Sequence, residues 1–217
     1  MNGGFILHGS PHSLPTYRVA LMLRLCRVGF SFRYISFQRG VHRTPEFRAF
    51  SRWGQVPVLE HQGRVLVQSA AILEYLAENL GQFTGSGVEA QQHVREWLFW
   101  DADRLMPPLY SWYSVELGRR GLLPLHFDSV LVVELDQKGQ VALVSLDNHL
   151  ADRRFLVGDA ATIADICCYA DIAFARLSNK KLADWPNVVA WADRVEHLPG
   201  FAAPFELLAM RDGEVTP

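Results

Sequence analysis

The first part of the chain alternates short apolar runs with one longer helical pattern. Residues 5–9 (FILHG) form a short apolar run that ends at glycine, which predicts a strand. Residues 18–26 (RVALMLRLC) are apolar on almost every side, which predicts a buried helix. Residues 30–37 (FSFRYISF) alternate apolar and polar positions, as a half-buried strand does. The chain therefore begins with a strand, a helix and a second strand.

A second helix, a hairpin and a third helix follow. Residues 44–50 predict a short helix, because threonine is a favoured N-cap and proline is tolerated at the first helical position. Residues 56–68 contain two β-branched runs joined by His-Gln-Gly, which is the composition of a hairpin. Residues 69–81 have apolar positions three and four apart and end at glycine, as a helix does. The order β-α-β-α-β-β-α predicts an α/β domain over residues 1–81.

The pattern changes beyond residue 81. Residues 82–87 (QFTGSG) are rich in glycine, serine and threonine, and they predict a linker. Residues 88–217 contain no firm strand pattern, so we expect an all-helical bundle. The segment 128–150 is ambiguous, since VLVV alone suits a strand, but its length favours a helix. Thr162 and Asp165 have the spacing of a capping box at the start of an apolar helix.

Composition narrows the function classes. The chain has 217 residues, 49% of them hydrophobic, which suits one or two packed domains. The net charge is -2 and no long basic cluster is present, so nucleic acid is not expected as a partner. No apolar run reaches the roughly 20 residues of a membrane span, and the first residues lack a secretion signal. Three cysteines without metal-ligand spacing favour a reducing, cytoplasmic compartment and no metal.

Five short segments together resemble a known family. No single segment is very specific, but all five occur in the order and spacing found in the cytosolic glutathione transferases, over nearly the whole chain. The segments are GSPHSLPTYRV (9–19), HRTPEF (42–47), GQVPVLE (54–60), QSAAILEYLAE (68–78) and TIADI (162–166).

The resemblance implies a thioredoxin-like N-terminal domain that binds glutathione as co-substrate. It also implies an all-helical domain, residues 88–217, that supplies most of the pocket for a small apolar electrophile. Homodimers and a role in detoxification are further expectations from the resemblance.

Ser13 is the residue that the resemblance implies for thiol activation, in the manner of the serine-type theta and phi-like classes. A free thiol has a pKa near 8.5, so the protein must favour the thiolate, and a hydroxyl at a helix N-terminus can do so. From the residues alone, Ser13 is better explained as the N-cap of the following helix. The two roles can coexist. Ser10, beside Pro11, is better explained by turn formation.

The resemblance further implies contacts to the glycine end of glutathione from His42, Arg43 and Gln55. A cation there would pair with the terminal carboxylate, although Arg43 also suits a solvated loop. The preceding residues 51–53 (SRW) depart from the usual Asn-Pro of the family, which leaves the shape of this loop open.

Two dipeptides match the remaining glutathione contacts of the family. Val56 and Pro57 match a cis-proline whose preceding residue pairs with the tripeptide as a short added strand, though an edge-strand proline is the plainer interpretation. Gln68 and Ser69 lie where a strand ends and a helix begins, so backbone N–H groups can bind the γ-glutamyl carboxylate. Many relatives have glutamate in place of Gln68, so we expect weaker binding of the ligand's amino group. An ordinary helix cap is the alternative for Ser69.

The resemblance places an electrophile pocket beside Ser13 and in the helical domain. The aromatic residues that follow the Pro107-Pro108 break are better candidates for an apolar wall than the WLFW stretch before it, which spans too many faces of a helix. The expected pocket residues are His12, Leu14, Tyr110, Trp112 and Tyr113.

Taken together, these features predict a glutathione transferase that activates the thiolate of glutathione for attack on an apolar electrophile. Glutathione-dependent reduction of disulfides or peroxides would use the same site. A non-catalytic ligand-binding or protein-interaction module of the same fold is a second alternative, which Gln68 and the unusual 51–53 loop keep open.

Overall fold

The computed structural model describes residues 4–122, 128–178 and 180–217. The chain forms two compact units, which are Met1–Gln82 with Leu198–Pro217, and Phe83–His197. None of the helices in the described ranges is both long and apolar enough to cross a membrane.

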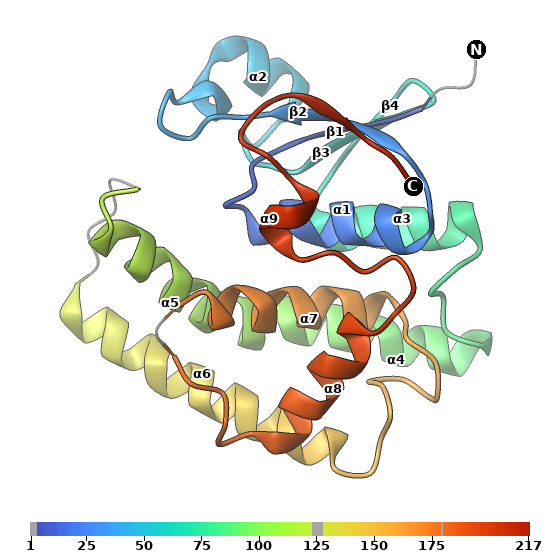
Figure 1. Ribbon diagram of the computed structural model, residues 1–217, viewed down its shortest axis with the longest axis vertical. Helices are drawn as coiled ribbons and strands as arrows, with labels where there is room; N and C mark the ends of the chain where they lie inside the picture. The colour runs from blue at the N-terminus through green and yellow to red at the C-terminus, as the bar shows by residue number, and fades with distance from the viewer. Residues whose placement is uncertain (1–3, 123–127, 179) are drawn as a thin grey trace. The chain divides into compact units, whose positions relative to one another are not determined.

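The N-terminal unit has the element order that the sequence predicts (Figure 1). The thioredoxin-like β-α-β-α-β-β-α arrangement is therefore confirmed. A short 3-10 helix (Val41–Arg43) precedes α2. The elements are β1 (Phe5–Gly9), α1 (Leu14–Leu25), β2 (Phe30–Tyr34), α2 (Pro45–Phe50), β3 (Val58–His61), β4 (Arg64–Val67) and α3 (Ser69–Leu80).

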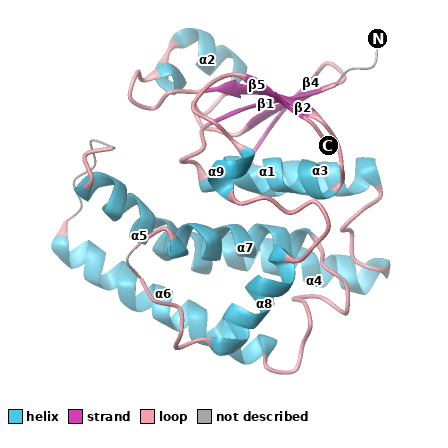
Figure 2. Ribbon diagram, viewed as in Figure 1, coloured by secondary structure: helices cyan, strands magenta, loops and turns pink. Residues whose placement is uncertain are grey.

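The sheet of this unit has the strand order β4-β3-β1-β2-β5. Strands β1 and β2 are parallel, with Phe5 opposite Phe30, whereas β3 is antiparallel to β1 and to β4. Helices α1 and α3 pack together on one side of the sheet and α2 lies on the other (Figure 2). The apolar pattern of residues 18–26 explains why α1 is buried along almost its whole length.

The C-terminal segment differs from the predicted boundaries. Residues 198–217 belong to the N-terminal unit, not to the helical domain. They form the short helix α9 (Pro204–Leu207) and the strand β5 (Gly213–Val215), which is antiparallel to β2. The sequence GEV has no apolar alternation, and its pairing depends on backbone hydrogen bonds to a strand about 180 residues away. A local pattern cannot reveal such a contact.

The second unit is helical, as predicted. Its elements are α4 (Gly87–Trp100), a short π-helical segment η2 (Asp101–Leu105), α5 (Met106–Arg119), α6 (Ser129–Leu150), α7 (Ile163–Arg176) and α8 (Pro186–Glu196). The ambiguous segment 128–150 is a helix. The capping box is also confirmed, because Asp165 accepts the N–H of Thr162 at 2.8 Å while Thr162 caps α7. Asp165 additionally accepts the indole N–H of Trp191 at 2.9 Å, so one carboxylate joins α7 to α8.

A buried histidine links the sheet of the N-terminal unit to α3. The ring of His61 stacks on Phe5 with centroids 3.8 Å apart, and its Nδ1 lies 2.8 Å from the hydroxyl of Tyr75. Burial, and then the charge of nearby Arg64, lower the pKa of His61 below its usual value. The folded protein therefore holds this imidazole neutral.

The lowered pKa of His61 predicts a loss of stability in mild acid. Below a pH of about 6.5 the unfolded chain protonates this histidine while the folded protein resists, so the free energy of unfolding falls as the pH falls. We expect wild type to lose stability more steeply than His61→Gln between pH 7.5 and 5, in urea unfolding at each pH. Parallel curves for the two proteins would contradict the burial argument.

Candidate functional site

Ser13 is the N-cap of α1. Its hydroxyl oxygen accepts the N–H of Thr16 at 3.2 Å, and its own N–H donates to the carbonyl of Ser10 at 2.9 Å. The residue is only 3% exposed. Within the described residues, no acceptor takes the hydroxyl hydrogen of Ser13. The predicted cap is confirmed, and it leaves the hydrogen free to be donated to a ligand.

The other two hydroxyls of this stretch have local roles, as expected. The Ser10 hydroxyl accepts the N–H of His12 at 3.3 Å, and the Thr16 hydroxyl accepts the N–H of Ser10 at 3.5 Å. Thr16 also packs so closely on Gly9 that a β-carbon there would lie 2.2 Å from its methyl group. A glycine at the end of β1 is therefore required by packing.

The loop at residues 51–55 is closed by a buried serine. The Ser51 hydroxyl donates to the carbonyl of Gln55 at 2.9 Å and accepts the N–H of Gln55 at 3.2 Å. Between them, Gly54 has a φ of 62° and leaves no room for a β-carbon, which would lie 2.8 Å from the carbonyl oxygen of His42. Sequence reasoning left this loop open and missed Ser51, although serine and glycine three residues apart are a turn signal.

Gln55 leads directly into the Val56–Pro57 peptide bond, which is cis, as the resemblance implies. Val56 packs against the buried cluster of Ile35, Phe47 and Val58. In the described part of the chain, nothing hydrogen-bonds to the peptide N–H or carbonyl of Val56. Its backbone is therefore fixed by packing and open to pairing with an added strand.

Gln68, the residue before α3, has a strained backbone. Its φ of 69° and ψ of 111° are rare for a residue with a side chain. The side-chain amide donates to the side-chain oxygen of Gln55 at 3.3 Å, which brings two expected glutathione contacts together. Ser69 follows as the first residue of α3, where backbone N–H groups can bind an anion. Strain of this kind is typical of ligand-binding positions.

His42 and Arg43 lie together in the 3-10 helix. The Arg43 Nε–H donates to Nε2 of His42 at 3.2 Å, and the His42 ring lies edge-on to Phe37. Burial, and then the Arg43 charge, lower the pKa of His42. In the neutral ring Nε2 accepts, so Nδ1 carries the proton, and this buried Nδ1 has no partner among the described residues.

The expected pocket residues beside Ser13 divide into two environments. His12 is half-buried and its ring lies 5.3 Å from that of Phe205, in an edge-on arrangement. Burial lowers its pKa, which keeps the imidazole neutral. Leu14, in contrast, exposes none of its surface and packs in the core. The pocket role expected of Leu14 stays a prediction.

The three aromatic residues of α5 lie on different faces. Tyr110 and Tyr113 are three residues apart and share one face, with ring centroids separated by 6.3 Å. Burial raises the pKa of Tyr110 to about 12, so its phenol is neutral. Trp112 packs so tightly on α6 that a β-carbon at Gly139 would lie 2.7 Å from its ring. Trp112 and Tyr113 are both buried, at 6% and 3% exposed, so the pocket role expected of them stays a prediction.

The side chains that the structure describes hold no group of three or more histidine, cysteine or acidic residues suited to a metal ion. The polar groups around Ser13, Val56 and Gln68 are instead hydroxyl, amide and backbone groups. Such groups suit a peptide-like ligand that carries carboxylates and a thiol.

Comparisons with known proteins agree with this fold. Residues 12–79 match the family model of the glutathione S-transferase N-terminal domain, and residues 108–199 match that of the C-terminal domain. A glutathione S-transferase-like protein, LUC7 from Fusarium sp, is 30% identical over 82% of this chain and 83% of its own length. The chain therefore belongs to the glutathione S-transferase family, whose members use glutathione as co-substrate.

Two further relatives bear on function. A crystal structure of a glutathione S-transferase from Xanthobacter autotrophicus py2 is similar with a TM-score of 0.85 and 29% identity, over 94% of this chain and 98% of that one. A probable elongation factor 1-gamma 2 from Arabidopsis thaliana is 28% identical over 76% of this chain, but the match spans only 40% of that protein. Relatives with an enzyme name and with a translation-factor name thus share this sequence pattern.

The strained backbone of Gln68 predicts that relieving the strain raises the stability of the protein and weakens its binding of glutathione. Glycine adopts a positive φ without strain, so Gln68→Gly should raise the free energy of unfolding by about 1 kcal/mol after the entropic cost of glycine. Loss of the side-chain amide should weaken glutathione binding roughly tenfold. Urea unfolding and calorimetric titration measure the two effects.

Gln62, in the turn between β3 and β4, supplies the control, because it also has a positive φ, of 50°. Gln62→Gly should leave the affinity for glutathione unchanged. If Gln68→Gly has a lower free energy of unfolding than wild type, or binds glutathione as tightly, then the strained backbone of Gln68 does not contribute to glutathione binding.

Proposed function

We propose that this protein is a glutathione transferase in which Ser13 donates its hydroxyl hydrogen to the glutathione thiolate. The observation that carries the proposal is the Ser13 hydroxyl itself, whose oxygen caps α1 and whose hydrogen has no other acceptor in the described chain. Lowering the thiol pKa from about 8.5 by about 2 units requires about 2.7 kcal/mol. A hydrogen bond to a charged acceptor supplies roughly 1.5 to 3 kcal/mol, and a helix N-terminus adds roughly 0.3 to 1.

The other groups of the N-terminal unit would orient the tripeptide. Ser69 and the N-terminus of α3 receive the γ-glutamyl carboxylate, and Gln68, held by Gln55, receives the neighbouring amino group. The backbone of Val56 pairs with the cysteine residue of glutathione. Arg43, with the Nδ1–H of His42, receives the glycine carboxylate.

In the reaction, the thiol proton passes to water and a sulfur lone pair attacks the electrophilic carbon. The leaving group departs with its bonding electrons, and no bond forms between protein and substrate. In the helical unit, the shared face of Tyr110 and Tyr113 supports a contact with an apolar electrophile. A cytoplasmic location agrees with Cys26, Cys167 and Cys168, which are buried and form no disulfide in the described structure.

Ser13 variants separate the capping role from the thiolate role. Ser13→Ala loses both, so we expect the thiol pKa of bound glutathione to rise by about 1 to 2 units and the protein to lose about 1 kcal/mol of stability. Ser13→Asp keeps a cap acceptor but cannot donate at neutral pH, so stability stays near wild type while the thiol pKa still rises. Ultraviolet titration of bound glutathione and urea unfolding report the two quantities.

Ser10→Ala is the matched control, since that hydroxyl only accepts the N–H of His12. It should leave the thiol pKa unchanged. An unchanged thiol pKa in Ser13→Ala would remove the proposed role of Ser13.

Two other activities use the same fold. Reduction of disulfides or peroxides differs only in the electrophile that the thiolate meets, and turnover of a chlorodinitrobenzene, a bis(2-hydroxyethyl) disulfide and an organic hydroperoxide ranks the reactions. A non-catalytic module is favoured by Gln68, which lacks the charge of glutamate, and by the elongation factor relative. That alternative predicts no glutathione density after a crystal is soaked in glutathione.

We also propose that the protein is a homodimer that associates through α6. Four valines on one face of α6 are exposed, at spacings of three, eight and three residues: Val130, Val133, Val141 and Val144. A cavity of about 600 Å³ beside this face is lined by apolar residues, among them Trp100, Pro107 and Val141, and by the charged residues Asp103, Arg104, Glu134 and Lys138. A face of this kind is costly in water, and a second copy would bury it by twofold symmetry.

A charge on this face should dissociate the dimer. Val141, which is 67% exposed, tolerates Val141→Asp in the folded monomer, but a paired interface would have to bury two carboxylates. Sedimentation velocity should show a dimer for wild type and a monomer for Val141→Asp. Val88→Asp, at an 86% exposed position at the start of α4, should remain dimeric. A wild-type monomer, or a dimeric Val141→Asp, would contradict this interface.

A further inference from the structure

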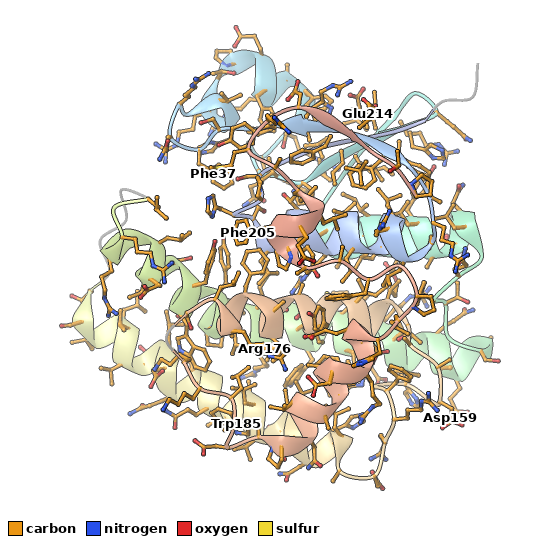
Figure 3. The ribbon with its side chains drawn as sticks, viewed as in Figure 1. Phe37, Asp159, Arg176, Trp185, Phe205 and Glu214 are labelled. Atoms are coloured by element: carbon orange, nitrogen blue, oxygen red, sulfur yellow. The ribbon has the colours of Figure 1, made fainter. Side chains whose placement is uncertain are left out.

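The C-terminal segment 198–217 is anchored to the N-terminal unit at both of its ends. Toward the end of the chain, β5 pairs with β2, and a carboxylate oxygen of Asp212 accepts the N–H of Tyr34 at 2.8 Å. The Ser31 hydroxyl donates to Glu214 at 2.7 Å, which fixes the register of β5. These contacts hold the segment as part of the sheet, and Figure 3 marks Glu214 in this strand.

The helix α9, nearer the start of the segment, is fixed against α1. The hydroxyl of Tyr17, on α1, donates to the carbonyl of Ala202 at 2.9 Å. Glu206 accepts the N–H of Ala203 at 3.2 Å, which closes the start of α9, and Leu207 is buried. Contacts inside the N-terminal unit therefore fix the position of α9.

Phe205 is the apolar residue of α9 that the described structure leaves exposed. Its side chain is 47% exposed, while its neighbours Pro204 and Leu207 are buried. The Phe205 ring lies edge-on to His12, with ring centroids 5.3 Å apart and an interplanar angle of 62°. His12 directly precedes Ser13, and its backbone is held by the Ser10 hydroxyl.

The His12–Phe205 pair has the character of a wall for a flat apolar ring. Partial burial lowers the pKa of His12, so the half-buried imidazole adds no charge to this surface at neutral pH. Two aromatic rings in an edge-on arrangement offer a face and an edge to a third ring, which is a favourable geometry for aromatic clusters. The buried residues Pro204 and Leu207 hold Phe205 at the surface, where its ring is open to contact with a ligand.

We propose that Phe205, positioned by α9 and β5 against His12, selects electrophiles that carry an aromatic ring. The proposal rests on the transferase function proposed above, because it places the second substrate beside Ser13. It assigns substrate specificity to a residue that lies near the end of the chain and outside the helical unit.

The test uses the full-length protein with three variants. Phe205→Ala removes the ring, Phe205→Leu keeps apolar bulk without an aromatic face, and Met210→Ala changes a 63% exposed residue of the same segment. The first readout is calorimetric binding of 1,3-dinitrobenzene, which has no leaving group. The second is kcat/KM for a chlorodinitrobenzene and for a short alkyl iodide, and the third is the Kd of glutathione.

We expect Phe205→Ala to weaken dinitrobenzene binding and to lower kcat/KM for the chlorodinitrobenzene by about tenfold each, with Phe205→Leu between it and wild type. The alkyl iodide reaction, the glutathione Kd and every property of Met210→Ala should stay within about twofold of wild type.

Each outcome separates this proposal from the transferase function. If wild type binds dinitrobenzene but Phe205→Ala binds it equally well, the proposed contact between Phe205 and the aromatic ring is wrong, whatever the transferase activity of the two proteins. An equal loss for both electrophiles, or no binding of dinitrobenzene by wild type, overturns it as well. If wild type shows no transfer to any electrophile, yet dinitrobenzene binding depends on Phe205, the wall stands and the transferase function fails.

Discussion

The hydrogen bond from the Thr16 N–H to the Ser13 hydroxyl is the interaction on which the rest of the site depends. Helix α1 is buried along its length, so the N–H groups of its first turn need a partner inside the protein. Ser13 supplies that partner, and in doing so it fixes its own hydroxyl at the positive end of a helix dipole. Folding and thiolate stabilisation thus require the same side-chain geometry. The two roles conflict little, because capping uses the oxygen and donation uses the hydrogen.

Around this cap, the N-terminal unit builds the proposed glutathione site largely from backbone constraints. Gly9 permits the close approach of Thr16, Ser51 closes the loop before Gln55, and Gln68 adopts a conformation that few side chains tolerate. These features are fixed before a ligand binds, so little conformational entropy has to be lost on binding. The returning C-terminal segment adds Phe205 beside His12 by the same means, through strand pairing and buried leucine packing.

Local sequence patterns were sufficient for the features that depend on near neighbours. The helix over 18–26, the Ser13 and Thr162 caps and the helix over 128–150 are each determined by side chains within a few residues, and each is confirmed. The cis bond before Pro57 needed the family resemblance, since most such bonds are trans.

The prediction that failed concerns a contact between distant residues. Strand β5 pairs with β2 across most of the chain, so residues 198–217 lie outside the helical domain in which they were expected. Trp112 packs against Gly139 of α6, whereas Tyr110 and Tyr113 share another face of α5. Periodicity alone could have separated Trp112 from the two tyrosines, because residues one or two apart on a helix do not share a face.

The central claim is that one hydroxyl both caps α1 and holds the glutathione sulfur. A crystal structure of the protein with bound glutathione tests it most directly. The account predicts that the sulfur lies within hydrogen-bond distance of the Ser13 oxygen while the Thr16 N–H contact persists, with the γ-glutamyl carboxylate at Ser69. A sulfur bound away from Ser13, or a bound complex in which Ser13 has released Thr16, would contradict it.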